Sequence, residues 1–169
     1  MKSIKLLLAI FSIVFVFAFS ASAQDIIFTS LDGEKINLAS QKGKVVVLAI
    51  GASWLPLSTQ QAIAINKLAK KYNDTQVAFY FIATDSSTQK SKNYATDDQI
   101  RKFAANNKIT ISILRDSEGA SSLKQYKIDQ VPAFIIIDKN GKTADGPFTG
   151  IDPKSDISIP LSQKIDKLL

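Results

Sequence analysis

Two continuous apolar runs dominate the pattern of hydrophobic and polar positions along the chain. Residues 45–50 and 77–83 read VVVLAI and VAFYFIA, and both runs have the length of a strand. β-Branched and aromatic residues without a polar face are typical of strands buried on both sides, as in parallel sheets. The pattern therefore predicts two central strands of an α/β fold.

Segments with helical spacing of apolar residues lie between the two strands and after them. From Thr59 to Tyr72 the apolar residues fall on one face while the lysines fall away from it, which predicts an amphipathic helix lying on the sheet. Thr96 with Gln99 three residues later forms a capping box that opens a second helix. The polar stretch 84–95 before it is expected to be a long exposed loop.

Turn signals place the shorter elements. Asp32-Gly33 between the runs 26–29 and 35–38 predicts a β-hairpin at the start of the fold. A short strand is expected over 109–114, and a turn at 117–119 should lead into a helix that ends near Tyr126.

The last third of the chain is organised by prolines. A strand should follow Val131-Pro132, because a proline that opens a strand removes no ladder hydrogen bond. Residues 139–141, Lys-Asn-Gly, then turn the chain back. Pro160 is expected as the first residue of a closing helix that runs to Leu168. The order of elements predicts a central mixed sheet with helices on both faces.

The first two dozen residues differ from the rest. Lys2 and Lys5 precede an apolar run that ends at Phe19, and Ala21-Ser22-Ala23 follows. This arrangement predicts a cleavable export signal over 1–23 and one domain over 24–169. A retained membrane anchor is the alternative, but the run is shorter than the ~20 residues that a spanning helix needs. We therefore expect a periplasmic or extracellular protein without stable membrane insertion.

Composition excludes several classes of chemistry. The chain has neither cysteine nor histidine, so the usual zinc, copper, haem and iron–sulfur sites and the Ser-His-Asp and Cys-His nucleophiles are excluded. We expect no cofactor and no metal. The net charge of +6 comes from lysines scattered along the chain, which favours solubility over nucleic-acid binding.

The stretch 52–58, Ala-Ser-Trp-Leu-Pro-Leu-Ser, ends the first apolar run. Together with the hairpin sequence and residues 126–142 it resembles the thioredoxin-like proteins of the TlpA/ResA and redoxin group, related to AhpC/TSA proteins. Their motif reads approximately F-W-A-S-W-C-P-P-C here. The resemblance implies a thioredoxin-like fold in which Pro132 is cis and faces the motif turn.

The departures from this motif remove the chemistry of the group. Leu55 and Ser58 stand where the group has its two thiols, and Gln61 stands where some members place a carboxylate. Thiol–disulfide exchange needs a thiolate and a second, resolving thiol. Ser58 is expected simply to cap the helix that starts at Thr59, although a Ser-Lys pair is formally possible. No catalytic residue is therefore assigned.

Without the thiols, the motif turn still offers an apolar surface. Trp54, Leu55, Pro56 and Leu57 form an apolar turn, and in this fold the backbone before the cis-proline can pair with an extended peptide. We therefore expect an unidentified protein or peptide of the cell envelope to bind at this turn, with Val131 and Pro132 as further contacts.

Three alternatives stay open. Leu55 and Leu57 merely close a disused turn, with Trp54 half-buried against Pro132. The chain is a noncanonical oxidoreductase whose partner supplies the thiols, or an enzyme with an unrelated activity at the same cleft. In the third alternative, the protein has a purely structural role in an envelope complex.

Overall fold

The first apolar run forms strand β3 (Val45–Gly51) at the centre of a mixed sheet, and all of its residues are buried. β4 (Val77–Ala83) pairs with it in parallel on one side, and β6 (Ala133–Ile137) pairs antiparallel on the other. The computed structural model describes residues 26–169, so the predicted signal segment 1–23 lies outside the described residues.

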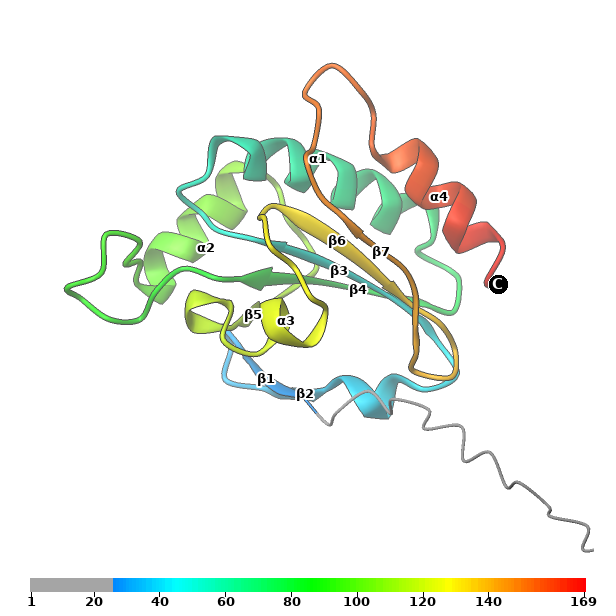
Figure 1. Ribbon diagram of the computed structural model, residues 1–169, viewed down its shortest axis with the longest axis horizontal. Coiled ribbons are helices and arrows are strands. Elements are labelled where there is room, and N and C mark those ends of the chain that lie inside the picture. The colour runs from blue at the N-terminus through cyan, green and yellow to red at the C-terminus, as the bar shows by residue number, and fades with distance from the viewer. Residues whose placement is uncertain (1–25) are drawn as a thin grey trace, which may run out of the picture.

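Seven strands make up the sheet of the described residues, in the order β2-β1-β5-β4-β3-β6-β7 (Figure 1). The outer strands are β1 (Ile27–Ser30), β2 (Lys35–Asn37), β5 (Ser112–Arg115) and β7 (Thr143–Phe148). β3, β4 and β5 run parallel, and the other pairs are antiparallel. The predicted mixed α/β sheet and the hairpin around Gly33 are both confirmed.

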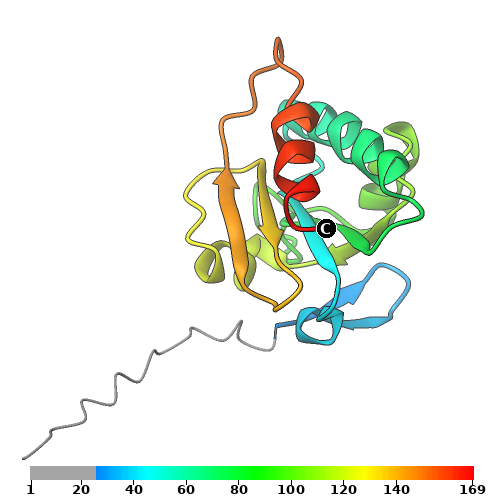
Figure 2. The ribbon, with the colours of Figure 1, turned by 90° about the vertical axis from the view of Figure 1, so that its right-hand side faces the viewer.

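The two faces of the sheet are covered unequally (Figure 2). One apolar layer lies under three helices, α1 (Pro56–Lys71), α2 (Asp97–Asn106) and α4 (Ser158–Asp166). The other face is covered by the short α3 (Ser122–Gln125), by Leu38 of a 3-10 turn, and by Tyr126 and Ile128. β3 contributes alternate side chains to both layers, which explains its unbroken apolar sequence.

The predicted boundaries of three elements, α1, α4 and β5, are wrong. α1 begins at Pro56, because proline suits the first helical position, and Ser58 is therefore inside the helix and does not cap it. α4 begins at Ser158, which places Pro160 third in its first turn. β5 begins only at Ser112, three residues after the predicted start.

The stretch 84–95 is exposed in its middle part, residues 87–94, as predicted, but its two ends are not. Thr84, Asp85, Ser86 and Ala95 are buried, and only the tip of the loop is exposed. A bridge between Ser86 and Tyr94 closes the loop on itself. Tertiary hydrogen bonds satisfy the polar groups that the sequence alone would place in water.

The far end of α1 is fastened to the C-terminal segment. Lys67 forms an ion pair with Asp156 at 2.8 Å, and Lys71 forms one with Asp166 at 3.0 Å. The Tyr72 hydroxyl lies 3.0 Å from the carbonyl oxygen of Ser162 and also hydrogen-bonds Asp166. We call these contacts the α1–α4 clamp.

β7 forms an irregular edge of the sheet. Its register against β6 shifts twice, and it contains a second cis peptide bond, Gly146–Pro147, which the sequence did not predict. Asp145 in this strand pairs with Lys164 of α4 at 2.5 Å, and this contact lowers the pKa of the Asp145 carboxyl.

Among the helices of residues 26–169, none combines the length and the apolar character that crossing a bilayer requires.

Candidate functional site

The motif turn and the cis-proline segment meet at one end of the sheet. Ile50 of β3 is the direct partner of Ala133 of β6. The turn 52–55 follows β3, and Val131-Pro132 immediately precedes β6, so both segments lie at the same end of the strands (Figure 1). The Val131–Pro132 peptide bond is cis, as the resemblance implied.

The predicted contact residues differ in how accessible they are. Trp54 is 51% exposed and Pro56 is exposed, whereas Leu55, Leu57 and Val131 are half-buried. Pro132 is buried. The turn therefore presents an apolar surface from Trp54 to Leu57, whereas the predicted contact at Pro132 is closed off from solvent.

The two positions of the missing thiols have separate environments. Leu55 is the N-cap of α1 and makes no side-chain capping bond. Ser58 is fully buried, and its Oγ has no hydrogen-bond partner within residues 26–169. A hydroxyl that is sealed from solvent and not bonded to a base is not activated as a nucleophile. The formal Ser-Lys pair therefore finds no support, and the turn carries no reactive group.

Gln61 is the best-connected polar side chain beneath the turn. It is fully buried, and its Nε2 donates to the carbonyl oxygen of Ile50 at 3.2 Å and to that of Ala133 at 2.8 Å. The side chain thus joins α1 to both strands that border the site. Sequence reasoning treated Gln61 only as a lost carboxylate, although a glutamine on the buried stripe of a helix is a signal of such a role.

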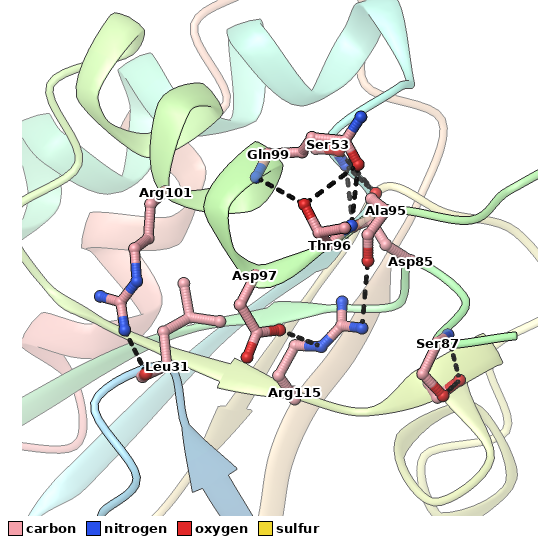
Figure 3. Close-up of polar contacts among 11 residues, drawn as sticks. Leu31, Ser53, Asp85, Ser87, Ala95, Thr96, Asp97, Gln99, Arg101 and Arg115 are labelled. Carbon is pink, nitrogen blue, oxygen red and sulfur yellow. Dashed lines mark hydrogen bonds and ion pairs between the residues drawn. The ribbon is translucent and has the colours of Figure 1, made fainter. Parts of the chain in front are cut away.

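Asp85 holds the opposite side of the turn. It is fully buried in the segment after β4, and both of its carboxylate oxygens lie 3.0 Å from the backbone nitrogen of Ser53 (Figure 3). The Ser53 hydroxyl donates to the same carboxylate at 2.6 Å. Sequence reasoning missed this contact because Asp85 lies in a polar stretch that resembles a solvated loop.

Neighbouring contacts fix the helix next to this segment. Arg115 at the end of β5 pairs with Asp97 at 3.2 Å and hydrogen-bonds the carbonyl oxygen of Ala95 (Figure 3). The predicted capping box of Thr96 and Gln99 is confirmed, with Thr96 as the N-cap of α2. The loop that carries Asp85 is therefore anchored at both of its ends.

Gly51 explains how the polar groups fit under the turn. A Cβ on this residue would lie 2.3 Å from Gln61 Oε1 and 3.0 Å from Ser58 Oγ. Both oxygens are buried without a partner among the described residues. The absence of a side chain at Gly51 therefore makes room for the Gln61 amide, and these three residues form one packed unit.

The site offers little for acid–base or metal chemistry. Among residues 26–169 no three His, Cys, Asp or Glu side chains are grouped so that they could hold a metal ion. Burial raises the pKa of Tyr126, on the other face of the sheet, to about 12, so its phenol stays protonated near neutral pH.

Comparison with known proteins places these features in context. A profile of the AhpC/TSA family matches residues 19–145. Thioredoxin-like protein YneN of Bacillus subtilis (strain 168) is 32% identical over 125 residues, or 73% of this chain and 67% of YneN. Thiol-disulfide oxidoreductase ResA of Bacillus thuringiensis subsp. konkukian is 27% identical over 120 residues, and this match spans 64% of ResA, less than two thirds of its length.

Solved structures agree on the fold. A secreted Mycobacterium tuberculosis disulfide oxidoreductase homologous to E. coli DsbE superposes with a TM-score of 0.64 at 22% identity, covering 85% of this chain and 96% of that one. A thioredoxin-like protein from Aeropyrum pernix gives a TM-score of 0.67 at 20% identity, covering 85% and 89%. The thioredoxin-like fold that the motif residues implied is confirmed.

Proposed function

This chain belongs to the AhpC/TSA family, and we propose that it is an exported member that has given up thiol–disulfide exchange and binds an extended polypeptide at the motif turn. The substitution of both thiol positions supports the first part. A leucine offers no nucleophile, and a buried serine hydroxyl forms no disulfide. Export is supported by the sequence of residues 1–23 and by the likeness to a secreted oxidoreductase.

The observation that carries the binding proposal is a pair of unpaired backbone groups, those of Val131, beside an apolar turn. Within residues 26–169 no hydrogen bond uses the N–H or C=O of Val131. An extended polypeptide can pair with such groups and gain main-chain hydrogen bonds. The turn from Trp54 to Leu57 would cover the apolar side chains of the bound segment.

A thiol-free probe tests this proposal directly. Carboxamidomethylated α-lactalbumin is an unfolded polypeptide whose thiols are blocked, so it binds by shape and contact alone. We expect it to bind the protein lacking residues 1–23. The double variant Leu55→Ala/Leu57→Ala should bind at least tenfold more weakly, because two apolar contacts are removed.

The matched control is Ile159→Ala, which removes an exposed apolar side chain of α4 outside the turn and should leave binding unchanged. Equal affinity of the double variant and the unsubstituted protein would contradict the binding site.

Insulin reduction by dithiothreitol should not be accelerated by the protein. Clear turnover would instead favour an oxidoreductase that uses the thiols of its partner. Crosslinking in the native envelope would then identify the partner.

A further inference from the structure

The amide of Gln61 connects the two segments that border the proposed binding surface, the motif turn and the start of β6. Its Nε2 group donates both of its hydrogens, one to Ile50 at the end of β3 and one to Ala133 at the start of β6. Ala133 is the first residue after the cis peptide of Val131–Pro132. A single side chain on α1 therefore contacts both strands next to the proposed site.

This contact depends on amide chemistry. The two atoms that face the Nε2 group are carbonyl oxygens, which only accept hydrogen bonds. An ionised carboxylate has no hydrogen to donate, and an aliphatic side chain would leave both carbonyl groups without this donor. Glutamine supplies two hydrogens without adding a charge to a fully buried position.

The other border of the proposed binding surface, the motif turn, is held in a different way. Asp85 accepts from the backbone and hydroxyl of Ser53 and so fixes the turn that presents Trp54. The turn and the start of β6 are thus held by separate side chains from separate elements. Neither Gln61 nor Asp85 reaches the surface that a polypeptide would touch, because both are fully buried.

We propose that Gln61 is a positioning residue that holds the start of β6, so that the backbone of Val131 is preformed for pairing with an extended polypeptide. This inference rests on the proposed function. Backbone groups that are preformed for pairing bind more tightly because less conformational entropy is lost on binding. Removal of the amide contact should lower affinity even though Gln61 itself never contacts the ligand.

The substitution Gln61→Glu tests the proposal through its pH dependence. Near neutral pH the introduced carboxylate would face two carbonyl oxygens, and binding of carboxamidomethylated α-lactalbumin should fall about tenfold, the equivalent of one lost buried hydrogen bond. Burial and the two carbonyl groups should raise the pKa of the introduced carboxyl. As the pH falls through that pKa, the protonated carboxyl can donate to Ala133, and affinity should recover.

The quantity to report is the affinity of the variant divided by that of the unsubstituted protein at each pH, which cancels titration of the probe. The control Gln99→Glu makes the same substitution in an exposed capping box, and its ratio should stay flat. A ratio for Gln61→Glu that equals one at every pH overturns the proposal. A ratio that is reduced but independent of pH also overturns it.

A second measurement separates this inference from the proposed function. Amide hydrogen exchange without any polypeptide should be faster at residues 133–135 in Gln61→Met, whose apolar side chain has a similar shape but no donor. Exchange in β4 should be unchanged. If the unsubstituted protein does not bind the probe, the proposed function fails, and the exchange result still decides whether Gln61 positions β6. Unchanged exchange at 133–135 overturns the positioning role.

Discussion

The two ends of helix α1 are stabilised in opposite ways. At its start, Leu55 caps the helix without a side-chain bond, the first turn carries no acidic residue, and the Ser58 hydroxyl has no partner among the described residues. At its far end, Lys67, Lys71 and Tyr72 all contact the segment 156–166. The start of the helix lies at the motif turn, and its end is bound to the C-terminal segment.

This difference shows how the fold keeps an apolar surface accessible. The α1–α4 clamp, the hydrogen bonds of Gln61 and the packing of Ile65 and Leu68 into the core hold the helix in place without a polar cap at its first turn. Residues 54–57 are therefore free to present apolar side chains and need not supply the polar caps that most helix starts require.

The largest effect that we expect comes from returning both thiols to the start of α1. Leu55→Cys/Ser58→Cys places two thiols three residues apart across a tight turn, in which the Ser58 nitrogen donates to the Leu55 carbonyl at 3.0 Å. The helix N-terminus favours a thiolate at the first position. Insulin reduction should rise from no turnover to a clear rate, and Leu55→Ala/Ser58→Ala should stay inactive. A double-cysteine variant that forms its disulfide but remains inactive would show that residues around the motif turn, besides the two thiol positions, also prevent thiol–disulfide exchange.

Gly51→Ala should produce the largest loss of stability. The added methyl group would collide with Gln61 Oε1, and overpacking of this kind costs about 1–3 kcal/mol of unfolding free energy. Gln61→Ala in the same chain removes the obstacle, so the double variant should be more stable than the sum of the two single changes predicts. Urea unfolding of all four proteins measures this coupling, and strict additivity would contradict the packed unit under the turn.

Tyr72→Phe should weaken the clamp at the far end of α1. It removes a buried hydroxyl that hydrogen-bonds Ser162 and Asp166, so the free energy of unfolding should fall by about 1 kcal/mol. Binding of carboxamidomethylated α-lactalbumin should stay unchanged, because the clamp lies at the opposite end of the helix from the motif turn. A loss of binding in the folded variant would mean that the two ends of α1 are coupled.

Asp156→Asn should have the smallest effect and should depend on pH. The contact with Lys67, aided by Ser158, lowers the pKa of Asp156 to about 2. The pKa of this carboxyl is lower in the folded state than in the unfolded state, where it is about 4, so the charged form stabilises the folded protein at pH values above about 4. This contribution to the free energy of unfolding disappears as the pH falls toward about 2. The variant should therefore be less stable by under about 1 kcal/mol at pH 6. Thermal unfolding of both proteins should show this difference shrinking with acidification, and a constant difference would argue against the ion pair.

Much of the fold could be predicted from local sequence patterns. The strand over 77–83 has its predicted bounds because an apolar run of that length has few alternatives in an α/β protein. Thr96 and Gln99 formed the predicted capping box because both partners lie within one turn of helix. The cis-proline was implied by the motif resemblance.

The site was harder to predict because its polar contacts join distant parts of the chain. Gln61 reaches Ala133 across 72 residues, and Asp85 reaches Ser53 across 32. No local pattern encodes either contact. Ser58 was misplaced for a local reason, since Pro56 can start a helix as well as a serine can cap one.

The irregular rim at β7 bears on how the protein behaves when it is concentrated. An open edge of a sheet invites other chains to add strands, which leads to aggregation. Shifted register, Pro147 and the paired Asp145 all interrupt the row of groups that such stacking needs. The protein has no disulfide that could limit unfolding and so protect it from aggregation. The irregular edge at β7 would instead discourage self-association through this strand.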